Sequence, residues 1–140
     1  MCLRTYQKEP EILEEDLIVY KQLECINDDL VSPYQRNEII LDDPIYFKWT
    51  LNVLYQTKIE QTMDKQFADW TSQKHYTNFW DDESLLSYGP GFHSYNSKDR
   101  IKKLHGDFIT FECLIPKGSE VYRDETGLLV SNQLIVLKEI

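Results

Sequence analysis

The residue best equipped for chemistry is His93, in the segment Gly89–Tyr95, which reads GPGFHSY. A histidine titrates near neutral pH and can act as an acid, a base or a ligand. The flanking glycines would let a bound molecule approach the backbone closely. In a strand, His93 and Tyr95 share one face. Three roles are open for His93: a structural residue hydrogen-bonded at a strand end, a ligand contact, or a catalytic group.

A nucleophilic triad would need a serine or cysteine beside a histidine. Ser94, Ser119 and Ser131 are candidates, but the sequence has no GxSxG elbow. Cys113 lies in the most apolar segment of the chain, so we expect it to be an inert core residue. We therefore assign no catalytic residue and lean towards a protein that is not an enzyme.

Metal and nucleotide sites leave their own spacing patterns. The three histidines stand at positions 75, 93 and 105, without HxH, HxxxH or HExxH spacing. The carboxylate run at 81–83 lacks the pattern of a calcium loop. Neither GxxxxGK nor GxGxxG occurs. We expect no metal and no cofactor.

Aromatic residues are abundant, with nine Tyr, six Phe and three Trp. Tyr and Trp are favoured anchors at protein interfaces. The stretch 76–82, YTNFWDD, combines rings with acids. The expected contact residues are Tyr76, Trp80, Trp70, His93 and Tyr95. The leading hypothesis is therefore a non-enzymatic interaction domain that binds an unidentified protein.

The formal net charge is −9, and residues 1–43 carry 11 acids against 4 bases. Phosphate backbones repel this balance, so direct nucleic-acid binding is not expected. The acidity has two interpretations, which are solubility and mimicry of a nucleic acid. The mimic needs Asp28, Asp29, Asp42 and Asp43 spaced like phosphates on one face. The basic run at 98–103 is expected to be a solvated helix face.

Location is inferred from cysteine use and from the start of the chain. Cys2, Cys25 and Cys113 are odd in number and widely spaced, which indicates a reducing compartment. The start, MCLRTYQKEPEILEED, lacks the apolar core of a signal peptide. No apolar run approaches the roughly 20 residues that span a bilayer. We expect a cytoplasmic protein with no membrane partner.

Length and periodicity predict one globular domain over residues 1–140, with 60–88 as a possible variable insertion. Alternation and β-branched residues predict strands. The expected strands cover 16–25, 30–34, 47 to about 60 with a bend near Asn52, 92–95, 107–115, 120–123, 128–131 and 134–138. We expect helices over about 59–73 and 98–104, and a loop with a short helical turn over 75–88. The fold class is α+β, a mainly antiparallel β-sheet with one or two short helices.

Several segments together resemble a group of small uncharacterised phage and bacterial proteins. The segments are the N-terminal MCL, EEDLIVYK, SPY at Ser32–Tyr34, GFHSY at Gly91–Tyr95, CLIPKGSEVY at Cys113–Tyr122 and VSNQLIV at Val130–Val136. Such proteins carry GFHS-type and IPKGS-type segments and a VS-type final strand. The resemblance implies one domain, encoded by a phage and acting on a host protein, and no transferable activity.

The order VYK, GFHSY, IPKGSEVY and LLVSNQLIV also resembles a degenerate form of the ADP-ribosyltransferase strand order. That resemblance implies that Lys21 stands where an Arg would be, with a pocket near Gly91–Tyr95. Ser94-Tyr95 departs from the STS element, and Gly127–Val130 has no acid where a glutamate is expected. The carboxylate stabilises the developing cation, so its loss argues against transferase activity. A small ligand-binding protein or enzyme is the alternative.

Overall fold

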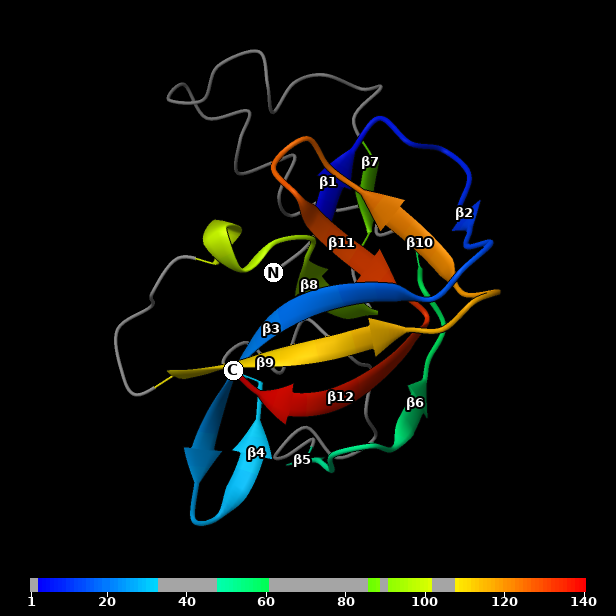
Figure 1. Ribbon diagram of the computed structural model, residues 1–140. Helices are drawn as coiled ribbons and strands as arrows, with labels where there is room; N and C mark the ends of the chain where they lie inside the picture. Colours follow the sequence, from blue (N-terminus) through cyan, green and yellow to red (C-terminus); the bar gives the residue numbers. More distant parts are fainter. Residues whose placement is uncertain (1–2, 33–47, 61–85, 89–90, 102–107) are drawn as a thin grey trace, which may run out of the picture.

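The computed structural model describes residues 3–32, 48–60, 86–88, 91–101 and 108–140. Within these residues the fold is mainly antiparallel β-sheet with almost no helix. The larger of two sheets has the strand order β2-β10-β11-β8-β3-β9-β12-β6, with β4 and β5 attached beside β3. In Figure 1 the long strands β3, β9 and β12 lie side by side, and β10 and β11 run at a steep angle to them.

The strands before residue 60 are short, apart from β3. Their bounds are β1 Leu3–Thr5, β2 Glu11–Ile12, β3 Leu17–Ile26, β4 Asp29–Val31, β5 Lys48–Trp49 and β6 Leu54–Gln56. The later strands are β7 Leu86–Tyr88, β8 Phe92–Tyr95, β9 Phe108–Ile115, β10 Glu120–Arg123, β11 Leu128–Ser131 and β12 Gln133–Glu139. A 3-10 helix, η2, covers Lys98–Arg100.

Two tight turns explain why neighbouring strands pair as hairpins. Asn27 and Asp28 both have positive φ, 52° and 69°, between β3 and β4. Two successive positive φ values suit the right-handed twist of a hairpin, and Asn and Asp tolerate them. Asp124 turns β10 into β11, because its carboxylate accepts from the backbone N–H of Thr126 and Leu128. The expected turns at both places are confirmed.

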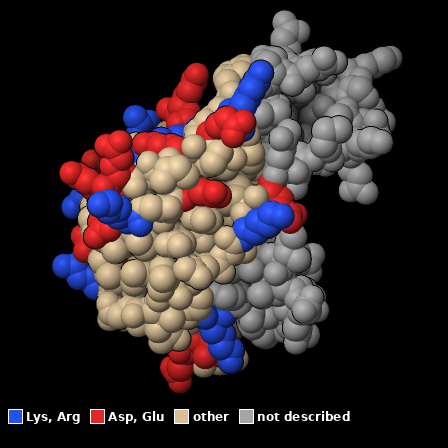
Figure 2. Space-filling model, turned by 90° about the vertical axis from the view of Figure 1, so that its right-hand side faces the viewer, with Lys and Arg blue, Asp and Glu red and all other residues tan. Residues whose placement is uncertain are grey.

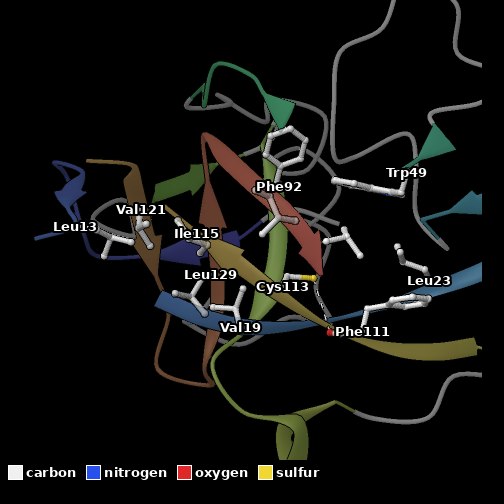
Figure 3. Close-up of a cluster of buried hydrophobic side chains, with 12 residues drawn as sticks. Leu13, Val19, Leu23, Trp49, Phe92, Phe111, Cys113, Ile115, Val121 and Leu129 are labelled. Carbon is white, nitrogen blue, oxygen red and sulfur yellow. Dashed lines mark hydrogen bonds between the residues drawn. The ribbon is translucent and has the colours of Figure 1, made fainter. Parts of the chain in front are cut away.

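One side of the large sheet encloses the main core. Val19 of β3, Cys113 of β9 and Val136 of β12 face one another across three strands and are fully buried. Figure 3 shows these strands and β8, β10 and β11 contributing side chains such as Phe92 and Val121 to the same cluster. The expectation that Cys113 is a core residue is confirmed. We call the side of the sheet that carries these residues the core face, and the opposite side the outer face.

A second, smaller core lies on the outer face of β10 and β11. It consists of Leu3, Tyr88, Leu128 and Val130, with Tyr122 packed against them. Strands β1 and β7 pair antiparallel as a separate two-stranded sheet over this area. The rings of Tyr88 and Tyr122 stack with centroids 3.8 Å apart. Burial raises the pKa of the Tyr88 hydroxyl to about 12, with the nearby Tyr122 adding to the shift.

Several expectations from the sequence need correction. The strand expected from 47 to 60 is two short strands, β5 and β6, separated by a turn in which Asn52 has a φ of 61°. The helix expected over 98–104 is the 3-10 helix η2, which ends at Arg100. Ser97 caps it as expected, because its Oγ accepts from the N–H of Asp99. Residues 86–88, expected in a loop, form strand β7.

Strand β9 also differs from its expected environment. Apolar residues on both of its faces predicted a strand buried on both sides, but burial alternates from Thr110 to Ile115. Phe111, Cys113 and Ile115 are buried, while Glu112 and Leu114 remain partly exposed. The helix expected over about 59–73 lies outside the described residues from position 61 onward, and Ile59 and Glu60 are not helical.

Candidate functional site

The structure describes two of the five predicted contact residues, His93 and Tyr95. His93 and Tyr95 lie on strand β8, where they face Val130 and Leu128 of β11. Because those two partners belong to the second core, His93 and Tyr95 share the outer face, as the sequence predicted. Trp70, Tyr76 and Trp80 lie outside the described residues, so their proposed surface stays a prediction.

His93 is buried, with 6% of its surface exposed. Neither ring nitrogen makes a hydrogen bond within the described part of the chain, and the Gly91 backbone only weakly favours the charged ring. Desolvation and the nearby charge of Lys21 lower the pKa of His93 to about 3. The ring is therefore neutral at physiological pH. The three roles considered for His93, structural residue, ligand contact and catalytic group, all stay predictions.

The side chain of Lys21 enters the main core from β3. It is 4% exposed, and its Nζ donates a 2.8 Å hydrogen bond to the backbone carbonyl of His93. The same ammonium lies 5.6 Å from the centroid of the Trp49 ring. A cation over an indole face is attracted by the ring quadrupole. Lys21 thus links strands β3, β5 and β8 through one buried charge.

Trp49 is fixed by its neighbours. Its Nε1 donates to the hydroxyl of Ser32 at 2.8 Å, and its ring makes edge contacts with Phe92 and Tyr55. On the core face of β8, the hydroxyl of Ser94 is fully buried without a hydrogen-bond partner in the described residues. This region brings together a cation, three aromatic rings and the Ser94 hydroxyl, which can donate one bond and accept others.

A second feature lies on the outer face and was missed in the sequence. Strand registers place four aliphatic residues directly opposite one another across four adjacent strands. This outer row consists of Ile18 on β3, Leu114 on β9, Ile135 on β12 and Leu54 on β6. Ile18 is 40% exposed and Leu54 is 46% exposed, while the two central residues are partly buried.

The rows on either side of the outer row are polar. On one side Tyr20 faces Glu112, which forms a 3.8 Å ion pair with Lys138. On the other side Gln133 faces Gln56. An exposed face of an antiparallel sheet normally carries polar residues. The outer row is therefore an apolar exception within a polar surface. The sequence feature that could have predicted it is the pair of neighbouring apolar residues in each long strand, because one residue of such a pair must face away from the core.

Charges on the surface are unevenly placed. Figure 2, which looks onto the side where β2 and β6 lie in Figure 1, shows acidic and basic groups bordering a wide area without charges. Asp28 is exposed, whereas Asp29 pairs with Lys48 at 3.3 Å. Asp42 and Asp43, which the nucleic-acid mimic also needs, lie outside the described residues.

The described part of the chain was also compared with the requirements of a metal site, a membrane span and a basic surface. No group of three His, Cys, Asp or Glu side chains within it is placed to hold a metal ion. Among the same residues, no helix has the length and apolarity that a membrane span requires. Of the basic run, Lys98 and Arg100 are exposed on η2, and the lysines at 102 and 103 lie outside the description.

Comparison of the chain with protein-family models, with curated proteins and with solved structures finds no significant match. Two features of the described chain remain as candidate sites, the buried region around Lys21 and the outer row.

Proposed function

We propose that the protein is a non-enzymatic interaction domain that binds another protein through the outer row. The observation that carries this proposal is the alignment of Ile18, Leu114, Ile135 and Leu54 across four strands of an otherwise polar face. Contiguous exposed apolar surface with a polar border is typical of protein–protein contact sites. The resemblance to phage proteins favours a host protein as the partner.

The test is affinity capture from a host lysate with three forms of the protein. The double variant Ile18→Thr/Leu54→Thr removes the two exposed ends of the outer row, and Thr preserves strand propensity. The control is Ile12→Thr, because Ile12 is 54% exposed but lies on β2, away from the row. Each change is at the surface, so stability should stay within about 0.5 kcal/mol.

A protein retained by the wild type and by Ile12→Thr, but lost with the double variant, supports the proposal. An identical set of retained proteins in all three forms contradicts it. The aromatic–acidic stretch is tested in the same experiment with Trp70→Ala/Tyr76→Ala/Trp80→Ala. Loss of the partner in that variant alone would move the interface from the outer row to that stretch.

A small-molecule site beside Gly91–Tyr95 is the second candidate. It is supported by the contact between Lys21 and the His93 carbonyl, which brings the cation of β3 beside the GFHSY strand, as the ADP-ribosyltransferase resemblance implies. The unpartnered hydroxyl of Ser94, which lies on the core face of β8 like the side chain of Lys21, adds to this support. The absence of an acid in Gly127–Val130 argues for binding without transfer.

Calorimetric titration with NAD⁺ and with nucleoside phosphates tests this second candidate. Binding that is lost in Lys21→Met but kept in Lys138→Met would support it, because Lys138 is exposed and far less constrained. Equal heats for both variants would reject the site.

A further inference from the structure

The outer row has dimensions that restrict its occupant. Neighbouring strands lie about 4.8 Å apart, so four aligned side chains extend over roughly 14 Å. Side chains three or four residues apart on a helix are separated by about 5–6 Å, close to the strand spacing. A helix laid across the strands can therefore place one aliphatic side chain over each gap of the row, using about three turns.

The charges beside the row restrict the occupant further. Glu14, Glu15 and Asp16 are exposed and come directly before β3, at the Ile18 end of the row. Asp16 is held there, because its carboxylate accepts from the backbone N–H of Lys117 at 2.8 Å. Along the Tyr20 side, Glu112 is already paired with Lys138. The exposed Lys117 stands beside these three acids, so the Ile18 end of the row keeps a net negative charge.

We propose that the outer row binds an amphipathic helix of another protein, with aliphatic residues at i, i+4 and i+7 bordered by Lys or Arg. This inference depends on the proposed function and adds the chemistry of the partner. Helix recognition of this kind uses a few aliphatic anchors on an apolar surface. Complementary charges at the rim mainly accelerate association and select the partner.

The probe is a synthetic Leu/Lys helical peptide of about three turns, compared with a Leu/Glu peptide of the same apolar face. Binding is measured by fluorescence anisotropy against the wild type, Ile18→Thr/Leu54→Thr and the control Ile12→Thr. We expect the Leu/Lys peptide to bind the wild type and Ile12→Thr equally, and the double variant at least tenfold more weakly. The Leu/Glu peptide should bind at least tenfold more weakly than the Leu/Lys peptide.

Other outcomes overturn the inference in distinguishable ways. Equal binding of the Leu/Lys peptide to the double variant would mean that charge alone attracts it. Equal binding of both peptides would show that the partner helix does not need Lys or Arg beside its aliphatic residues. If neither peptide binds while capture from the lysate still depends on the outer row, the partner is not a helix of this kind. The proposed function would then survive.

Two further measurements identify a different occupant. A dimer that appears in sedimentation of the wild type and disappears in the double variant would replace the helix by a second copy of the chain. Binding to vesicles of phosphatidylcholine and phosphatidylserine that depends on the row would replace it by a lipid surface. Either result overturns the assignment to a partner helix.

Discussion

The ammonium of Lys21 donates a 2.8 Å hydrogen bond to the backbone carbonyl of His93, although the residues are 72 positions apart. The bond ties β3 to β8 near the place where these strands pair only through Tyr20 and Tyr95. It also sets a positive charge close to an imidazole that has no hydrogen-bond partner within the described chain. The two residues therefore influence each other both mechanically and electrostatically.

Replacing Lys21 with Met should destabilise the fold and raise the pKa of His93. The His93 carbonyl would lose its buried donor, which costs about 1–3 kcal/mol. The pKa of the ring should rise because the Lys21 charge lowers it in the native protein. Urea unfolding gives the first effect and NMR titration of the His93 ring gives the second. Lys138→Met is the control, since its exposed ion pair with Glu112 contributes little. An unchanged His93 pKa in Lys21→Met would contradict the electrostatic link.

The buried, neutral ring of His93 should make stability depend on pH. Its pKa is about 3 in the folded protein and 6.5 in the unfolded chain, so between these values the unfolded chain binds the extra proton. Stability then rises with pH across this window and falls as the solution is acidified below about 6.5. The slope from this one group approaches about 1.4 kcal/mol per pH unit.

Urea unfolding at pH 5, 6 and 7 measures that slope. His93→Leu should remove it and change stability little at pH 7, because an apolar side chain can replace an unpartnered polar one at small cost. The comparison is restricted to this range because most carboxylates titrate lower. Equal slopes for the wild type and His93→Leu would show that the ring does not control the dependence.

Much of the sheet was predictable because local signals agreed with long-range packing. The hairpin of β10 and β11 has alternating residues on both sides of an Asp–Glu–Thr–Gly turn, and its bounds match the expected ones. Strand β3 and the last strand β12 were also expected close to their observed positions. In each case β-branched residues and turn chemistry point to the same structure.

The parts that escaped prediction depend on partners distant in sequence. Strand β1 pairs with β7, more than 80 residues away, and neither short segment carries a strong periodicity of its own. The register that aligns Ile18 with Leu54 is fixed by three successive strand pairings, which no local pattern reveals. The burial of Lys21 among apolar residues depends on the His93 carbonyl and the Trp49 ring, both brought in by other strands.

Gly91→Ala should destabilise the protein more than Gly118→Ala. A Cβ on Gly91 would lie 2.5 Å from Val130 Cγ1 and 3.3 Å from Ile59 Cγ1. A Cβ on Gly118 meets no atom within 4 Å, so only its positive φ of 86° opposes the change. We expect a cost of about 1–2 kcal/mol at Gly118 and at least about 1 kcal/mol more at Gly91, from overpacking. Equal losses in thermal or urea unfolding would contradict the close approach of β8 and β11.

The side-chain amide of Gln7 takes the place of a peptide group at the edge of β10. Its Nε2 donates to the carbonyl of Val121 at 3.0 Å, and its Oε1 accepts from the N–H of Arg123 at 2.9 Å. Gln7→Ala should therefore cost about 1–2 kcal/mol, because both backbone groups lose their partner. Amide hydrogen exchange locates the effect, since the Arg123 N–H should exchange faster while the centre of β3 is unchanged.

Gln56→Ala is the matched control for Gln7. Gln56 is an exposed glutamine on the edge strand β6, so its removal should leave stability within about 0.5 kcal/mol. The variant Gln7→Glu separates the two bonds, because a carboxylate still accepts from Arg123 but no longer donates to Val121. It should keep the slow exchange of the Arg123 N–H and lose only part of the stability. Fast exchange at Arg123 in the wild type would mean that Gln7 does not protect this edge.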